Sequence, residues 1–237
     1  MPHSRNSFSL SGPSRALDPR VNAMRGDLAD VDLAGKHFSP HYARPVERFC
    51  ALPFSSICDK PEGRQISELL AGEAFMLLDT SGGWAWGYSK QDHYVGYVLA
   101  DALAEVAAQP MALTAADAVE AAKQFLGQPY VWGGRGGSGI DCSGLIQRSL
   151  AAIGVMAPRD SDMQMDAAGV AIPESALLQR GDLIFFPGHV GMMVDAENMI
   201  HATQHHGKTV IEPLGDVVAR IAEEQDNPVL ARKRISQ

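Results

Sequence analysis

Residues 133–144 of this 237-residue chain read Gly133-Gly134-Arg135-Gly136-Gly137-Ser138-Gly139-Ile140-Asp141-Cys142-Ser143-Gly144, and this stretch decides how the second half of the chain folds. It is a glycine-rich loop that runs into apolar residues spaced like one face of a helix. Gly154 ends that pattern, so the sequence predicts a helix over 142–153. Cys142 then lies in the first helical turn, where unpaired N–H groups and the helix dipole favour a thiolate.

Two other interpretations of this stretch compete with a nucleophilic cysteine. A glycine-rich loop before a helix can bind phosphate, but this one lacks the Gly-Lys-Ser/Thr of a P-loop and does not follow a clear strand. A single cysteine is often buried and inert, which we expect for Cys50 and Cys58. The polar neighbours Asp141 and Ser143 argue against simple burial of Cys142.

A nucleophilic cysteine needs a base, normally a histidine, and a group that orients the base. Two of the eight histidines lie in predicted strands, His189 after a Pro-Gly turn and His201 twelve residues later. This spacing suits neighbouring antiparallel strands, although a strand histidine can equally be a structural hydrogen-bonding group. One cysteine and two histidines could also bind zinc. No CxxC or HxxxH pair supports that use, so we expect no metal.

The sequence before this region predicts a small β-barrel over residues 37–107, because short apolar runs alternate with turn residues. The predicted strands are 48–52, 74–78, 83–88 and 94–98. Trp84, Trp86 and Tyr88 alternate along one strand, and we expect them to fill the barrel core or a domain interface. Residues 1–36 are polar and rich in turn residues, which indicates an arm.

Residues 108–237 are predicted to form an α+β domain. A helix begins at Thr114 as its N-cap and stops at Gly127, and the helix over 142–153 follows. The later strand-like segments are 182–186, 189–194, 199–203 and 209–212. Helices followed by consecutive strands favour an antiparallel sheet.

Composition excludes several classes of protein. Hydrophobic residues make up 46% and charged residues 20%, as in an ordinary globular protein, and the net charge is 20 − 28 = −8. An acidic chain without a long basic run lacks the charge distribution of a nucleic-acid binder. No apolar stretch reaches the length of a membrane span, and the N-terminal residues show no signal peptide, so we expect a cytoplasmic location. Three unevenly spaced cysteines do not form a disulfide framework.

Together, Asp141-Cys142-Ser143-Gly144, Gly188-His189-Val190-Gly191 and Ile200-His201 resemble the NlpC-type cell-wall cysteine peptidases, a papain-like group that cleaves bacterial peptidoglycan stem peptides. The run from Tyr130 to Gly134 and the run from Arg180 to Phe186 fit the same pattern. The resemblance covers about 110–235 and implies a papain-like catalytic domain. The upstream barrel resembles the bacterial SH3-like domain that precedes it in γ-D-glutamyl-L-diamino acid endopeptidases. That subgroup acts on stem peptides with a free N-terminal L-Ala.

The resemblance also implies residue roles. Cys142 would be the nucleophile, His189 the base, His201 the residue that orients the base, and Tyr130 a neighbour of the oxyanion region. Positions that match substrate-binding residues of the family are Asp141, Ser143, Asp160 and Ser161, with Trp132 lining the pocket, Tyr94 closing it from the barrel, and Glu68 meeting the L-Ala ammonium group. No cofactor is implied.

The expected partner is a peptidoglycan stem peptide, L-Ala-γ-D-Glu-diamino acid, and a cytoplasmic enzyme of this type would process imported fragments in murein recycling. Two alternatives stay open at this point. The same Cys-His-His site could serve an amidase or acyltransferase, or the protein could bind wall peptides without catalysis. A purely binding protein has no use for a thiol at a helix start, which weighs against the last alternative.

Overall fold

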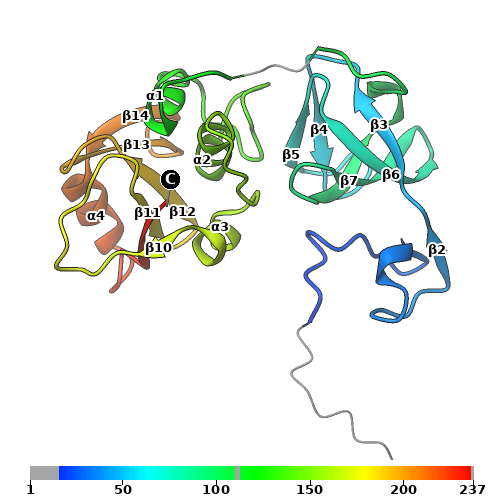
Figure 1. Cartoon of the computed structure of the whole chain (residues 1–237), viewed down its shortest axis with the longest axis horizontal. Helices are drawn as coiled ribbons and strands as arrows, with labels where there is room; N and C mark the ends of the chain where they lie inside the picture. Colours follow the sequence, from blue (N-terminus) through cyan, green and yellow to red (C-terminus); the bar gives the residue numbers. More distant parts are fainter. Residues whose placement is uncertain (1–15, 110–112, 236–237) are drawn as a thin grey trace, which may run out of the picture.

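The computed structural model describes residues 16–109 and 113–235, which form two lobes lying side by side (Figure 1). The first lobe is built on a seven-stranded sheet and the second on a six-stranded sheet with helices. Every strand pair within these two sheets is antiparallel. The α+β class predicted for the second half is therefore confirmed. Within the described ranges, no helix is long and apolar enough to cross a membrane.

The first lobe is a small barrel-like domain with strand order β5-β4-β8-β7-β6-β3-β9. Its strands are β3 (Val46–Cys50), β4 (Phe54–Cys58), β5 (Gln65–Leu70), β6 (Ala74–Ser81), β7 (Trp84–Ser89), β8 (Val95–Leu99) and β9 (Leu103–Ala104), with a 3-10 turn at Ala100–Ala102. The four predicted strands overlap β3, β6, β7 and β8. Strands β4 and β5 were not predicted, because Ser55, Ser56, Ser67 and Glu68 interrupt their apolar pattern.

The N-terminal segment packs on this lobe. It contains β1 (Leu28–Asp30) and β2 (His41–Ala43), which pair in parallel, with a 3-10 turn at Val31–Leu33 between them. Trp86 is buried beneath this segment, with the Arg25 guanidinium 4.6 Å from its ring centroid, while Ala85 on the opposite face of β7 belongs to the barrel core. The aromatic side of β7 therefore faces the N-terminal segment. Residues 1–15 of the predicted arm lie outside the described residues.

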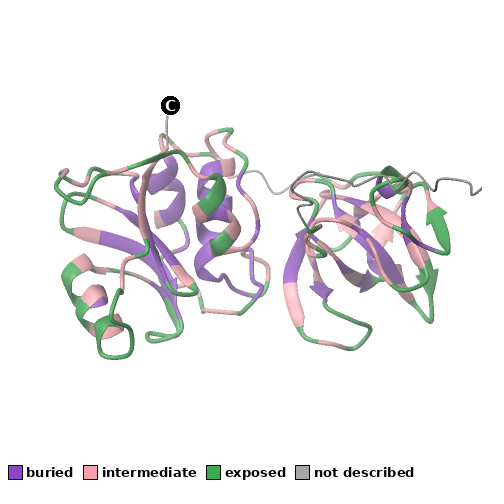
Figure 2. Ribbon diagram, turned by 90° about the horizontal axis from the view of Figure 1, so that it is seen from below, coloured by how far each residue is buried: buried purple, intermediate pink, exposed green. Residues whose placement is uncertain are grey.

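The second lobe has strand order β10-β15-β11-β12-β13-β14. Its elements are α1 (Ala118–Lys123), α2 (Cys142–Ala151), α3 (Ser161–Ala167), β10 (Val170–Ala171), β11 (Leu183–Phe186), β12 (His189–Met193), β13 (Asn198–Thr203), β14 (Lys208–Pro213), α4 (Leu214–Ala222) and β15 (Ala231–Arg234). Residues of α1 and α2 pack on one face of the sheet and residues of α4 on the other (Figures 1 and 2). This sandwich fixes the start of α2 against the sheet.

The predicted start of the first helix is wrong by several residues. The helix begins at Ala118 and not after Thr114, because the Asp117 side chain accepts a 2.9 Å hydrogen bond from the backbone N–H of Glu120 and caps it. Aspartate is among the best N-cap residues, so Asp117 defines the helix start.

A buried ionic network joins the two lobes at the glycine-rich loop. The Glu68 carboxylate on β5 accepts hydrogen bonds from the backbone N–H groups of Arg135 (2.7 Å), Gly137 (2.9 Å) and Ser138 (2.8 Å), and from the Ser138 hydroxyl. The fully buried Arg135 guanidinium is paired with Glu73 of the barrel. A Cβ atom at Gly137 would lie 2.4 Å from Cγ of Phe54, so this close approach requires glycine. The loop is therefore held on the barrel.

We expect Glu68→Gln to lower the free energy of unfolding by about 2–3 kcal/mol, because an amide cannot accept all four of these hydrogen bonds and leaves buried donors unpaired. Urea unfolding followed by tryptophan fluorescence measures the change. Glu105→Gln is the matched control, since Glu105 is 82% exposed and makes only a surface ion pair with Arg48. Equal stability of the two variants would contradict the assignment.

Candidate active site

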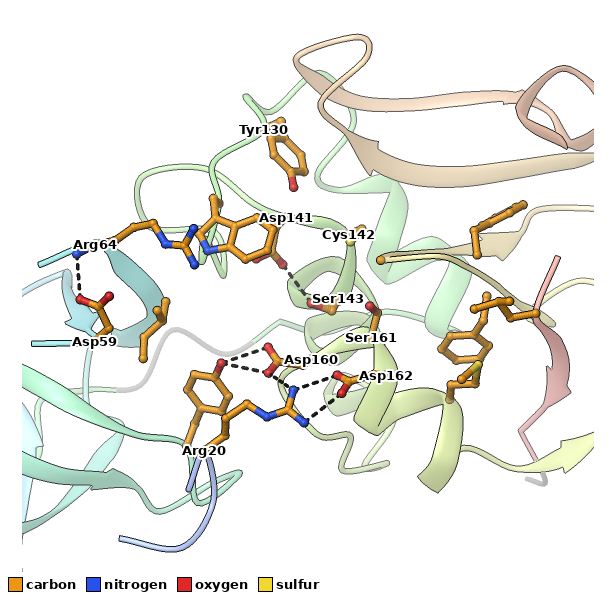
Figure 3. Close-up of a pocket in the computed structure, with 18 residues that line it drawn as sticks. Arg20, Asp59, Arg64, Tyr130, Asp141, Cys142, Ser143, Asp160, Ser161 and Asp162 are labelled. Atoms are coloured by element: carbon orange, nitrogen blue, oxygen red, sulfur yellow. Dashed lines mark hydrogen bonds and ion pairs between the residues drawn. The ribbon is translucent and has the colours of Figure 1, made fainter. Parts of the chain in front are cut away.

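A pocket of about 550 Å³ lies between the lobes and contains Cys142 (Figure 3). The second lobe, which contains Cys142 and is called the catalytic lobe below, contributes most of the pocket wall. The barrel contributes Asp59, Arg64, Ile66 and Tyr94, and the described part of the N-terminal segment contributes Arg20. Three parts of the chain that are far apart in sequence thus form one cavity.

Cys142 is the first residue of α2. The Asp141 side chain caps this helix by accepting a 2.7 Å hydrogen bond from the backbone N–H of Gly144. Burial, together with the negative charge of Asp141, raises the pKa of the Cys142 thiol to about 12, although backbone N–H groups of Val190 and Ser143 favour the thiolate. The expectation of a lowered pKa from the helix start is therefore wrong. Desolvation of the thiolate outweighs the helix dipole here.

The two predicted histidines are in contact. His189 begins β12 and His201 lies in β13, and their Nε2 and Nδ1 atoms are 2.8 Å apart. Nε2 of His201 lies 2.8 Å from Oε1 of Glu212 on β14. Burial lowers the pKa of His189 to about 3 and that of His201 to about 4, so both rings are neutral near pH 7.

The carboxylate at the end of this chain determines where the protons lie. Burial alone would raise the pKa of Glu212, but hydrogen bonds from Arg220, His206 and His201 lower it to about 2. The ionised Glu212 only accepts, so Nε2 of His201 carries the proton and its Nδ1 is an acceptor. Nε2 of His189 must then donate to it. This leaves Nδ1 of His189 unprotonated, as a base requires.

Asp141 and Ser143 line the pocket but are also tied to a buried arginine. Arg159 donates from Nη2 to Asp141 (2.6 Å) and from Nη1 to Asp141 (3.0 Å) and to the Ser143 hydroxyl (2.9 Å). Arg159 is 1% exposed, so its charge compensates Asp141 in a dry environment. Arg159 belongs to the run Pro-Arg-Asp-Ser over 158–161, of which the sequence predicted roles only for Asp160 and Ser161.

Asp160 and Tyr94 meet across the boundary between the lobes. The Tyr94 hydroxyl lies 3.0 and 3.1 Å from the two Asp160 carboxylate oxygens, as the dashed lines in Figure 3 show. Burial raises the pKa of Asp160 above its ordinary value, although Tyr94, Arg159 and Arg20 act against it. Ser161 lines the same side of the pocket. The structure therefore brings the predicted residues of the barrel and of the Pro-Arg-Asp-Ser run together.

Tyr130 and Trp132 lie on the other side of the pocket. The Tyr130 hydroxyl points toward the side where Asp141 and Cys142 lie (Figure 3), and burial raises the pKa of this phenol. Trp132 is 54% exposed, and the Arg64 guanidinium lies 5.0 Å from its ring centroid. Trp132 thus presents an open aromatic surface beside the nucleophile.

One predicted site residue is not in the pocket. Glu68 is fully buried, and its carboxylate is occupied by the N–H groups of the glycine-rich loop, so it does not meet a substrate ammonium group. The acidic residue of the barrel that lines the pocket is Asp59. The role predicted for Glu68 from the resemblance is therefore wrong. Its carboxylate holds the glycine-rich loop on the barrel.

Sequence reasoning missed Glu212, Arg159 and Arg20. Glu212 lies on β14, one strand away from His201, and an acidic residue in the strand next to a histidine strand is the signal that was overlooked. Nothing in the local sequence of the N-terminal arm pointed to Arg20. Among the residues that the structure describes, no group of three His, Cys, Asp or Glu side chains could hold a metal ion.

Comparisons with known proteins agree with this geometry. Residues 127–220 match the NlpC/P60 family, and residues 57–103 match the bacterial dipeptidyl-peptidase Sh3 domain. A gamma-D-glutamyl-L-lysine dipeptidyl-peptidase of Bacillus cereus is 40% identical over 106 residues, which cover 41% of this chain and 31% of that protein. A Bacillus subtilis protein of the same name is 37% identical over 106 residues, covering 41% and 34%.

The matched part spans about a third of the length of these two relatives. A crystal structure of an NlpC/P60 family protein from Bacillus cereus superposes with a TM-score of 0.44 and 26% identity, covering 79% of this chain and 62% of that one. The two domain matches lie on the two lobes, in the order barrel and then catalytic lobe. This chain therefore carries an NlpC/P60 domain preceded by an SH3 domain of the bacterial dipeptidyl-peptidase type.

Proposed function

We propose that this protein is a cysteine peptidase that hydrolyses the γ-D-glutamyl-diamino acid bond of peptidoglycan stem peptides with a free N-terminal L-Ala. The observation that carries the proposal is the position of Cys142. It lines a pocket together with Asp160 and Tyr94, and its sulfur meets the backbone N–H of Val190, the residue after His189, which begins the chain His189-His201-Glu212. The names of the two Bacillus relatives support the γ-D-glutamyl specificity.

The protonation pattern defines the chemical steps. As the Cys142 sulfur attacks the γ-amide carbonyl carbon, Nδ1 of His189 takes the thiol proton, so no free thiolate has to form in the buried site. The tetrahedral intermediate collapses as the imidazolium gives that proton to the leaving amine nitrogen, which breaks the C–N bond. A thioester remains, and water attacks it with His189 again as base, releasing the dipeptide acid and the thiol.

The oxyanion that forms in both steps needs hydrogen-bond donors already in place. We assign this role to the backbone N–H of Cys142, at the start of α2, and to the hydroxyl of Tyr130, which lines the same pocket. The raised pKa of Tyr130 keeps its phenol protonated, as a donor must be.

The other end of the pocket suits a small cationic terminus. Asp160 accepts from Tyr94 and lies beside further carboxylates, and a buried ammonium group requires such compensation. Two residues, L-Ala and D-Glu, then lie between the amine end and the scissile bond. We also propose that the natural substrates are small wall fragments handled in the cytoplasm during recycling, which cell fractionation with an antibody would test.

Mass spectrometry of L-Ala-γ-D-Glu-diaminopimelate digests tests the activity directly. We expect release of L-Ala-D-Glu by the wild type and none by Cys142→Ala. An N-acetylated peptide run in parallel reports on the amine pocket. If both peptides are cut, the peptidase stands without the free-amine requirement; if neither is cut, the activity belongs to another acyl donor, as in an amidase or acyltransferase.

Alkylation of Cys142 by iodoacetamide tests its protonation state. With a thiol pKa of about 12, the rate should rise about tenfold per pH unit from pH 6 to 9 without a plateau, because only the thiolate reacts. A variant with Cys50→Ser and Cys58→Ser isolates the signal. A fast, constant rate between pH 6 and 8 would instead show a stable thiolate-imidazolium pair.

Glu212→Gln tests whether Glu212 fixes the protonation of the two histidines through the chain His189-His201-Glu212. The amide no longer forces the proton onto Nε2 of His201, so we expect kcat to fall by about 10- to 100-fold with little change in KM. Asp195→Asn is a control, since Asp195 is an exposed turn residue at the far end of the hairpin. A loss seen in KM alone would contradict the role assigned to Glu212.

A further inference from the structure

Arg20 is the one pocket-lining residue that the N-terminal segment contributes, and neither domain match covers it. We propose that Arg20, held by the segment over 18–22, forms the end wall of the amine side of the pocket and makes the enzyme reject N-acylated peptides. This inference rests on the proposed peptidase function and assigns the residue that sets its free-amine specificity.

The backbone of this segment is fixed on the barrel. The carbonyl oxygen of Arg20 accepts a 2.8 Å hydrogen bond from the N–H of Val95, next to Tyr94. Asn22 folds back on Asp18, since its backbone N–H and its side-chain amide both donate to the Asp18 carbonyl. Arg25 then packs on Trp86, as described above. The segment is thus part of the folded barrel lobe.

The Arg20 side chain reaches from the barrel to α3 of the catalytic lobe. Nη1 donates to Asp160 (2.8 Å) and Asp162 (3.0 Å), and Nη2 donates to Asp162 (2.9 Å), as Figure 3 shows. Nε and Nη2 also donate to Asp18. All N–H groups of the guanidinium point at carboxylates, so Arg20 has no donor left for a substrate anion. Its role is to fill space and to hold the carboxylates.

The charge of this cluster favours an ammonium group over an amide. Three aspartates and Arg20 carry −3 + 1 = −2, so the cluster stays acidic even with the arginine in place. A substrate ammonium compensates part of that charge and donates to Asp160 beside Tyr94. An N-acyl group offers no positive charge, and its added atoms meet the guanidinium that closes this end. Both effects discriminate in the same direction.

Steady-state kinetics on the free and N-acetylated tripeptides test the assignment in the full chain. We expect the wild type to cut the free peptide with a much higher kcat/KM than the acetylated one, whereas Arg20→Ala should reduce the ratio of the two kcat/KM values by about tenfold or more. The change should come from a higher KM for the free peptide and from cleavage of the acetylated one, with kcat at saturation largely kept. Arg20→Lys keeps the positive charge but cannot bridge three carboxylates. Its kcat/KM ratio should therefore lie between those of the wild type and Arg20→Ala.

Arg25→Ala is the matched control. Arg25 belongs to the same N-terminal part of the chain, five residues after Arg20, but it contacts Trp86, Asp27 and Asp79 and does not line the pocket. It should leave the ratio unchanged, and thermal unfolding shows whether each variant is folded. An unchanged ratio in folded Arg20→Ala or Arg20→Lys, or an equal loss in Arg25→Ala, would overturn the role of Arg20 alone. A wild type that cuts neither peptide would overturn the proposed function, and one that cuts both equally would remove the specificity that Arg20 is meant to explain.

Discussion

The rest of the structure depends on the hydrogen bonds that the Glu68 carboxylate accepts from the backbone N–H groups of the glycine-rich loop. Glycines let the backbone of 133–139 turn tightly and expose its N–H groups, which then need an acceptor. Glu68 supplies that acceptor from the other lobe, and Arg135 returns a buried positive charge to the barrel. The loop leads directly into Asp141 and Cys142, so the same contact that joins the lobes also places the nucleophile. The glycine-rich loop does bind an anion through its backbone N–H groups, but that anion is the Glu68 carboxylate of the same chain and not a phosphate.

Burial is the second constraint, and it changes the chemistry that the helix start alone would give. The helix dipole stabilises a thiolate at the first turn of α2. Removal of water from the buried sulfur destabilises that thiolate by more, so the pKa of Cys142 is raised. The same burial keeps His189 and His201 neutral. The only fixed charges along the relay are then Glu212 and Arg220, at its outer end. A neutral pair at the reacting end and an ion pair at the outer end suit a mechanism in which proton transfer and attack occur together.

Most of the fold and the centre of the site could be predicted from the sequence because both depend on local patterns. Apolar periodicity predicted α2 and the strands β11 to β14, and the motifs around Cys142, His189 and His201 marked the chemistry, whereas α3, α4, β10 and β15 were not predicted. The errors have long-range causes. Strand β5 carries buried polar residues because they bond the other lobe: Glu68 accepts from the glycine-rich loop, and Ser67 accepts from Arg159. That long-range role of Glu68 cannot be read from its sequence neighbours, and the residue was mistaken for a substrate ligand. Glu212 and Arg20 reach the site through tertiary contacts that no local spacing records.

The pocket that spans the lobes separates two properties that many enzymes hold in one place. The thiol, the two histidines and Glu212, to which the proposed function assigns the chemistry, all lie within the second lobe. Part of the pocket wall comes instead from the N-terminal segment and the barrel, which contribute residues between Arg20 and Tyr94. Because Glu68 of the barrel also holds the loop that precedes Cys142, the barrel supports the nucleophile as well as part of the pocket wall. Under the proposed function, peptide selectivity then depends on both lobes, and exchange of the N-terminal lobe would change which peptide fits the pocket beside Cys142.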